Sequence, residues 1–368
     1  MKKNRFVFFL IGILIIIFAN SISVFADTPV PGDPPLVVLS VTANPSPTPL
    51  AKAKVSPNAS TTIRFRVHIP LLERGSDETA VNISSRHDVL DFYQNHYMAN
   101  TSTPINWTGS HTSCAPGTTS TNFQQAVLER INYFRAMAGV PASITFSADT
   151  NRKAQNAALM MSAAGQLSHS PASSWACYSP DGASAAGSSD LYLGEFSWNA
   201  ITGYIRDPGA GNEAAGHRRW ILYPQTQLMG TGDVPSSSQF YAANSLVIFD
   251  EHMSDPRPAT REAFVAWPPA GYVPAPIVFP RWSFSYAQAD FSAASVQMRS
   301  NGADLPVKLA SVANGYGENT LVWVPLRLGD WDNWPKIIAD TTYSVTVSNV
   351  IINGASRSFS YYVTVFNP

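Results

Sequence analysis

Two histidines and two acidic residues in the middle of the chain carry the side chains best suited to chemistry. His169 and His217 are separated along the chain by Glu195 and Asp207. Two neutral imidazoles are suitable ligands for Zn²⁺, and water or a carboxylate can complete the coordination. The nearby carboxylates could orient the imidazoles through their second nitrogens, or act as a general base on a bound water. Glu213 competes with Asp207 for the role of second acid, because it lies four residues before His217 on the same helical face.

The same histidines also have a purely structural interpretation. His169 follows the expected end of a helix and could cap it, and His217 could be a core histidine with satisfied hydrogen bonds. No stronger catalytic motif competes with them, because the sequence contains no G-x-S-x-G elbow, H-E-x-x-H helix, P-loop or C-x-x-C pair. The residue types alone therefore leave open whether the two histidines share a cleft.

Helices are expected to position these side chains, because residues from about 114 to 253 show mainly helical periodicity. Asn122 can cap the first helix, and Gly139 ends it. Ser147 opens a second helix, which Gly165 ends shortly before the first histidine. Two further helices and then two strands are expected at residues 197–206, 212–222, 227–232 and 240–249.

The composition excludes a chain that binds nucleic acid by charge. The 368 residues include 24 Lys+Arg and 25 Asp+Glu, so the basic excess that such binding needs is absent. Hydrophobic residues reach 45%, which is enough to form a core. Charged residues make up only 13%, so Ser, Thr, Asn and Gln must supply most of the polar surface. This balance is typical of an extracellular protein rather than of a cytosolic enzyme.

The first 26 residues have the pattern of a secretory signal peptide. A basic N-terminus precedes the apolar run Phe6–Ala19, and Val24-Phe25-Ala26 places small residues at the cleavage positions. We expect cleavage before Asp27. An uncleaved anchor is the alternative, but the apolar run is shorter than the ~20 residues of a spanning helix. The mature protein is therefore expected to be secreted, with no transmembrane segment.

Cys114 and Cys177 are the only two cysteines. In a secreted chain, such a pair indicates a disulfide rather than two free thiols. Two thiols alone also cannot form a structural zinc site.

Proline-rich segments divide the chain around the central helical region. Residues 27–113 form a segment rich in Pro, Thr and Ser, with short strand-like runs and a helix expected at 86–98. Residues 254–280 are a proline-dense connector. Residues 281–368 contain short alternating strands and Asn-Gly turns, which predict an immunoglobulin-like β-sandwich that folds by itself.

Several short motifs in the middle of the chain occur in an order that resembles the CAP superfamily of cysteine-rich secretory proteins, antigen 5 and pathogenesis-related 1. The resemblance covers residues 120–250. His169 is similar to the first histidine of the family, and Gly194-Glu195-Phe196 is similar to its Gly-Glu-Asn segment, with Phe in place of Asn. Asp207 stands where Glu is usual, and Gly216–Leu222 is similar to the segment that carries the second histidine.

The resemblance implies a fold and a site. It implies an α-β-α sandwich for residues 114–253, so the whole chain is expected to be α+β. It also implies one cleft, which His169, Glu195, Asp207 and His217 would line. In some members of the family the histidines bind a divalent metal, often zinc, and other members bind sterols or fatty acids in a separate groove. A few have been proposed to be peptidases, and the members share no single activity.

We therefore expect a secreted binding module for a small apolar ligand such as a lipid or sterol, for a divalent metal, or for both. The β-sandwich would contact other proteins or a component of the cell envelope. A zinc-dependent hydrolase or peptidase, with Glu195 as the base, is one alternative, and a structural envelope protein is another. The departures at Phe196 and Asp207 favour a binding protein over an enzyme.

Overall fold

The computed structural model describes residues 24–25, 38–39 and 81–368, and the chain divides into a unit at 1–73 and a unit at 74–368. In the first unit, strand β1 (Val24–Phe25) pairs antiparallel with β2 (Val38–Leu39). Most of the expected signal peptide and most of the Pro/Thr/Ser-rich segment lie outside the described residues. No helix in the described part of the chain is long and apolar enough to cross a membrane.

The central region of the second unit is mainly helical, as its periodicity predicted. Its helices are α2 (Thr121–Ala138), α3 (Ala148–Ala164), α4 (Pro180–Ala186), α5 (Ser197–Arg206), the 3₁₀-helix η2 (Ala210–Asn212) and α6 (Gly216–Ile221). Helix α1 (Arg86–Phe92), which continues as the π-helix η1 (Tyr93–Tyr97), precedes this region, where a helix was expected at 86–98. The expected helix at 212–222 is thus shorter than predicted, because Ala215 adopts a left-handed conformation (φ 51°) immediately before α6.

Local side chains explain where the long helices begin and end. The Oγ atom of Ser120 accepts a hydrogen bond from the backbone N–H of Phe123, so Ser120 caps α2 and the prediction of Asn122 was wrong. Ser147 caps α3 in the same way, as predicted. Gly139 and Gly165 end α2 and α3 with φ of 77° and 65°, a left-handed conformation that glycine adopts without strain.

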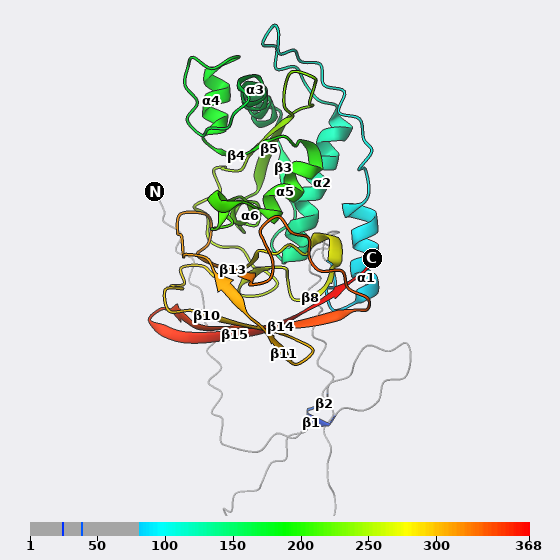
Figure 1. The fold of residues 1–368 in the computed structure, drawn as a ribbon, viewed down its shortest axis with the longest axis vertical. Coiled ribbons are helices and arrows are strands. Elements are labelled where there is room, and N and C mark those ends of the chain that lie inside the picture. Colours follow the sequence, from blue (N-terminus) through cyan, green and yellow to red (C-terminus); the bar gives the residue numbers. More distant parts are fainter. Residues whose placement is uncertain (1–23, 26–37, 40–80) are drawn as a thin grey trace, which may run out of the picture. The chain divides into compact units, whose positions relative to one another are not determined.

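A four-stranded sheet lies between two layers of helices (Figure 1). Its order is β3 (Thr145–Phe146), β5 (Leu228–Val234), β6 (Ala243–Val247) and β4 (Ser189–Leu193). Buried residues of α3 and α4 pack with Leu191 and Val247 on one face, whereas α2 and α5 pack with Met229 and Leu246 on the other. A Cβ atom at Gly232 would lie 2.1 Å from the Ala154 backbone, so this glycine lets α3 approach the sheet closely. The α-β-α arrangement is the one that the resemblance implied.

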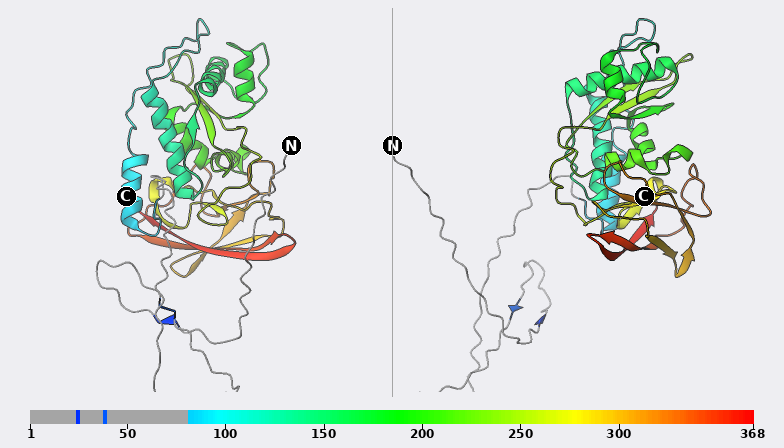
Figure 2. Two further views of the ribbon diagram at one scale, coloured as in Figure 1. Left: turned by 180° about the vertical axis from the view of Figure 1, so that it is seen from behind. Right: turned by 90° about the vertical axis from the view of Figure 1, so that its left-hand side faces the viewer.

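Beyond residue 264, two sheets whose neighbouring strands are mostly antiparallel form a β-sandwich. The five-stranded sheet has the order β11 (Ala303–Leu305), β10 (Ser295–Ser300), β14 (Thr341–Ile352), β15 (Ala355–Phe366) and β8 (Gly271–Pro274). The four-stranded sheet has the order β12 (Val307–Leu309), β13 (Thr320–Pro325), β9 (Trp282–Ser285) and β7 (Val265–Trp267). Figure 2 shows the two longest strands, β14 and β15, in orange to red. Asn301-Gly302 and Asn353-Gly354 form the hairpin turns, with positive φ at all four residues.

The expected connector at 254–280 needs correction in its second half. Strand β7 pairs with β9, β8 pairs in parallel with β15, and the 3₁₀-helix η3 (Ala275–Ile277) follows β8. Side chains of α2 and of both C-terminal sheets also share one hydrophobic core, in which Trp267 is fully buried. The independent folding of residues 281–368 stays a prediction, but a fragment that begins at 281 lacks a strand of each sheet.

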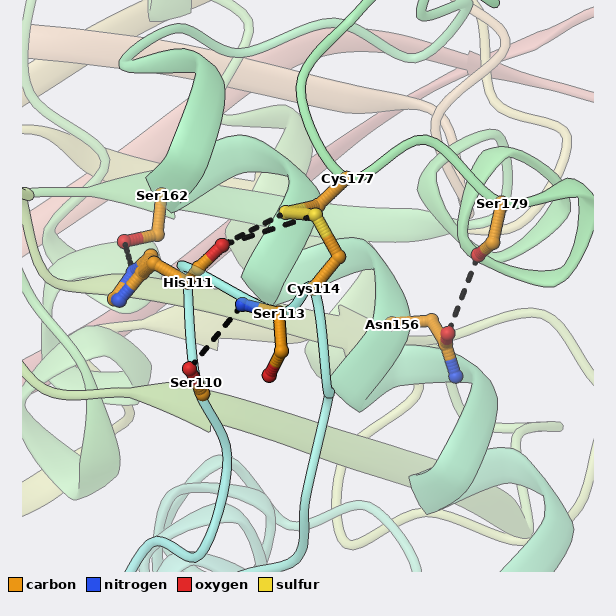
Figure 3. Close-up of a disulfide and its surroundings, with 8 residues drawn as sticks. All are labelled: Ser110, His111, Ser113, Cys114, Asn156, Ser162, Cys177 and Ser179. Atoms are coloured by element: carbon orange, nitrogen blue, oxygen red, sulfur yellow. Dashed lines mark hydrogen bonds between the residues drawn. A yellow bond between two sulfur atoms is a disulfide. The ribbon is translucent and has the colours of Figure 1, made fainter.

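Cys114 and Cys177 form the predicted disulfide, with the two Cα atoms 5.0 Å apart (Figure 3). The bridge joins the loop before α2 to the segment between α3 and α4. Beside it, His111 stacks on Phe240 at 3.9 Å, and its Nε2 atom lies 2.8 Å from the Ser162 hydroxyl. The loop is therefore tied to the helical layer by both a covalent bond and side-chain contacts.

We expect the double variant Cys114→Ser/Cys177→Ser to be less stable than the wild type by about 4 kcal/mol. The reason is that the bridge spans 63 residues and so restricts the unfolded chain strongly. Urea unfolding of both proteins without reductant measures the difference. Adding a reductant should destabilise only the wild type. Equal free energies of unfolding would show that the contacts around His111 hold the loop without the bridge.

Candidate functional site

Asp207 connects helix α5 to helix α6 and holds His217. It ends α5 in a left-handed conformation (φ 53°, ψ 53°), and its side chain is fully buried. One carboxylate oxygen accepts from the backbone N–H of His217 at 3.1 Å, and the other accepts from its Nδ1 at 2.7 Å. The carboxylate therefore caps α6, for which the N-cap residue Ala215 has no side chain that can do so. Asp207 thus takes the position beside His217, whereas its competitor Glu213 is exposed.

His169 lies in the turn that follows α3. Its Nδ1 is 2.9 Å from the carbonyl oxygen of Ala186 at the end of α4. A carbonyl oxygen can only accept, so Nδ1 carries the proton and donates it. Both His169 and His217 therefore use Nδ1 to bond an oxygen of the protein, and their Nε2 atoms are left for other contacts. This is the orientation that a second partner usually gives to an imidazole ligand of a metal.

Both histidines line a cavity of about 370 Å³, which we call the histidine cavity. Asp207 also contributes to its wall. The other walls are mainly apolar or aromatic and include Leu167, Leu191, Tyr192, Leu193, Tyr204, Pro208 and Trp331. The volume lies within the range of about 300–1,000 Å³ that is usual for small-molecule sites.

An adjoining cavity of about 360 Å³ is also lined by both histidines, and Asp190 on β4 contributes to it. Asp190 is 2% exposed, and its Oδ2 atom has no hydrogen-bond partner among the described residues. Burial raises the pKa of this carboxyl well above its usual value. Sequence reasoning missed Asp190. An acidic residue directly before the apolar run Leu191-Tyr192-Leu193 of one strand was the signal that could have identified it.

Glu195 lies apart from the other three predicted site residues. It is exposed and lines a third cavity, of about 550 Å³, together with Arg206 and Lys336. It is not among the residues that line either cavity beside the histidines. The chain turns between β4 and Glu195 at Gly194, whose φ of 101° favours glycine. The structure therefore brings His169, Asp207 and His217 together and leaves Glu195 outside.

Two aromatic residues of the C-terminal sandwich complete the cavities around the histidines. Trp331, in the loop between β13 and β14, lines the histidine cavity, and Tyr316, in the loop before β13, lines the adjoining one. The guanidinium of Arg219 lies 5.4 Å from the centre of the Tyr316 ring. No sequence motif in the central region could have indicated these residues, because they lie about 100 residues further along the chain.

The electrostatic environment of His217 favours its protonated form. Burial by itself lowers the pKa of this imidazole, but the hydrogen bond to Asp207 and the charges of Asp190 and Asp207 outweigh burial and raise the pKa to about 9.

The donors available for a metal are few. Among the described residues, no group of three or more His, Cys, Asp or Glu side chains is placed to hold a metal ion. The site thus offers two imidazoles, whereas a protein-bound zinc ion usually has at least three protein ligands.

Residues 128–249 match the sequence family described as CAP, the cysteine-rich secretory protein family. His169, Glu195, Asp207 and His217 all fall within the match. Residues 128–249 therefore form a CAP domain, as the motifs predicted. The site that we describe is therefore a CAP-domain site with walls that the C-terminal sandwich completes.

Solved structures with some similarity include the methionine-rich copper resistance protein PcoC of Escherichia coli, at 20% identity and a TM-score of 0.20. That match covers 27% of this chain and 92% of PcoC. Venom allergen-like protein 4 of Schistosoma mansoni is similar at 9% identity and a TM-score of 0.24, over 39% of this chain and 97% of its own. Such scores carry no argument about fold or function. No curated protein matched the chain.

We expect the free energy of unfolding to decrease as the pH rises from about 6.5 to about 9. His217 binds its proton more tightly in the folded protein, where its pKa is about 9, than in the unfolded chain. The resulting stabilisation is complete below the unfolded pKa of about 6.5 and is lost as the pH rises through the folded value. It amounts to at most about 3 kcal/mol.

Urea unfolding at a series of pH values, compared between the wild type and His217→Gln, isolates this contribution from that of the other histidines. NMR titration of the imidazole should also show that Asp207→Asn lowers the pKa of His217. If the wild type and His217→Gln depend on pH in the same way, the ion pair with Asp207 does not raise the pKa.

Proposed function

We propose that this CAP protein is a binding module whose histidine cavity holds a small ligand with an apolar body and an anionic or hydrogen-bond-accepting head. The observation that carries the proposal is the position of His217 in an otherwise largely apolar wall. Its Nδ1 is held by Asp207, so a protonated imidazole would present Nε2–H to the ligand. A fatty acid has this combination of groups, and the positive charge of the ring favours it over a sterol.

The apolar part of the wall supplies a driving force for binding. Leu167 is 44% exposed and Trp331 is 67% exposed, although both line the cavity. Each ligand CH₂ group that such side chains bury contributes about 0.8 kcal/mol. The burial of a chain of several carbons would thus provide affinity, while His217 would fix the orientation of the head.

The positions of the acids support binding over hydrolysis. Glu195, the expected general base, lines a different cavity from the histidines. Asp207 is fully buried, and its two oxygens already accept hydrogen bonds from His217. A hydrolase would need a base that reaches a water beside the histidines, and of the acids there only Asp190 has an unpartnered oxygen. Asp190 is 2% exposed, which limits its access to such a water.

Secretion is part of the same proposal. Most of the signal peptide that would direct it lies outside the described residues, while the CAP domain and the disulfide support an oxidising, extracellular environment. The expected partner outside the cell is then a component of the cell envelope. A purely structural envelope protein is the alternative, and it predicts no bound ligand.

We expect organic extraction of the purified protein, followed by mass spectrometry, to release a fatty-acid-like molecule. Dodecanoic acid should then displace a fluorescent fatty acid from the wild type. His217→Gln should bind it about 10–100-fold more weakly, because a hydrogen bond to a charged group is lost. His252→Gln is the matched control, since His252 pairs with Asp255 and lines neither the histidine cavity nor the adjoining one. Equal affinity of the wild type and His217→Gln would refute this role of the cavity.

A divalent metal is the second candidate ligand, favoured by the Nδ1 hydrogen bonds that orient both imidazoles. With only two protein ligands, we expect weak zinc binding, which His169→Ala and His217→Ala should each abolish. Glu195→Gln should leave it unchanged, because Glu195 lines a different cavity. Titration calorimetry with ZnCl₂ makes the comparison. Zinc binding that survives either histidine change would show that the two imidazoles do not form one site.

A further inference from the structure

The cavity of about 550 Å³ that Glu195 lines lies next to the histidine cavity, and we call it the tryptophan cavity. The two cavities share Tyr192, Gly203, Pro208 and Trp331 in their walls. The tryptophan cavity is formed by one face of α5, the segment around η3 and the loop between β13 and β14. Of the residues that line the tryptophan cavity, the proposed fatty-acid site uses only those shared with the histidine cavity.

Trp331 is exposed at the boundary of the two cavities, although its loop is firmly held. The side chain of Arg206 on α5 donates to the carbonyl oxygens of Trp331 and Asp332. Arg281, which is 2% exposed, pairs with Asp330 at 2.8 Å. The indole itself is 67% exposed. An aromatic side chain that is exposed on an anchored backbone can bury a large area at little conformational cost, which is the property of a binding hot spot.

The polar side chains of the tryptophan cavity are of mixed character. They include an acid, a base and two amides, namely Glu195, Lys336, Asn199 and Asn333. All four are exposed, and none of their side chains has a hydrogen-bond or ion-pair partner among the described residues. In addition, the Nε atom of Arg206 is buried without a partner. The cavity therefore presents both donors and acceptors beside the indole.

This combination matches the chemistry of a sugar rather than that of a lipid. Sugar hydroxyls both donate and accept, and the C–H face of a sugar ring can pack on an aromatic ring. The wall also contains an apolar patch at Ala275, Val278 and Phe279. An acetamido group has an amide that can pair with an Asn side chain and a methyl that can pack on such a patch.

We propose that the tryptophan cavity binds an oligosaccharide of N-acetylated amino sugars. This site is separate from the proposed fatty-acid site, although the two meet at Trp331. The same acetamido chemistry is found in free oligosaccharides and in insoluble wall polymers, so the experiment must separate these sources.

The test is a calorimetric titration of the mature full chain with tetra-N-acetylchitotetraose. We expect saturable binding, and binding at least about tenfold weaker in Trp331→Ala. Asn333→Ala and Lys336→Ala should also weaken it, and these two residues do not line the histidine cavity. Tyr241→Ala is the matched control, because Tyr241 is also exposed, at 63%, and lines none of the three cavities. Cellotetraose, which lacks acetamido groups, should bind at least about tenfold more weakly.

The results distinguish this proposal from the fatty-acid site. Asn333→Ala should keep wild-type affinity for dodecanoic acid, whereas His217→Gln should keep wild-type affinity for the tetrasaccharide. The proposal is overturned if the wild type does not bind the tetrasaccharide at millimolar concentration, if Trp331→Ala binds it equally well, or if cellotetraose binds as tightly. Co-sedimentation with chitin and with purified peptidoglycan then separates the sources. Retention on either polymer assigns the site to a wall glycan, and binding of the soluble tetrasaccharide alone assigns it to free oligosaccharides.

Discussion

The buried carboxylate of Asp207 is the group on which the site depends. A buried charge is costly unless it is paired and hydrogen-bonded, and here the partners are the imidazole and the backbone N–H of His217. The same residue ends α5, caps α6, and offers its own carbonyl oxygen to Arg281 of the C-terminal sandwich. One residue therefore fixes the angle between two helices, the orientation of His217 and the contact between two parts of the chain.

Buried arginines extend this network by binding carbonyl groups rather than acids. Arg135 is fully buried and donates to four backbone carbonyl oxygens. Arg218 bonds the end of α5 and the hydroxyl of Ser283, and Arg219 bonds carbonyl groups of the loop before β13. Such bonds satisfy helix ends that would otherwise be buried without partners. They also fix the loops of the sandwich against the CAP domain.

Because of this attachment, side chains of the sandwich line the cavities of the site. Tyr316 and Trp331 complete cavities whose histidines belong to the CAP domain. A CAP domain alone would therefore present His169 and His217 in a more open cleft than this chain does. The selectivity of the site for its ligand is then a property of both parts of the chain, and Trp331 is the residue at which the two cavities meet.

The sequence by itself determined several of the elements and three of the four predicted cavity positions. Helix α5 matches its predicted bounds, Gly139 and Gly165 end their helices as expected, and His169, Asp207 and His217 line one cavity. These outcomes depend on local backbone preferences and on motifs within one domain. Only the tertiary structure decided that Asp190 joins the histidines, that Glu195 does not, and that Trp331 closes the wall. The physical reason is that the environment of a side chain depends on strand pairing and on contacts between distant segments, which local periodicity does not encode.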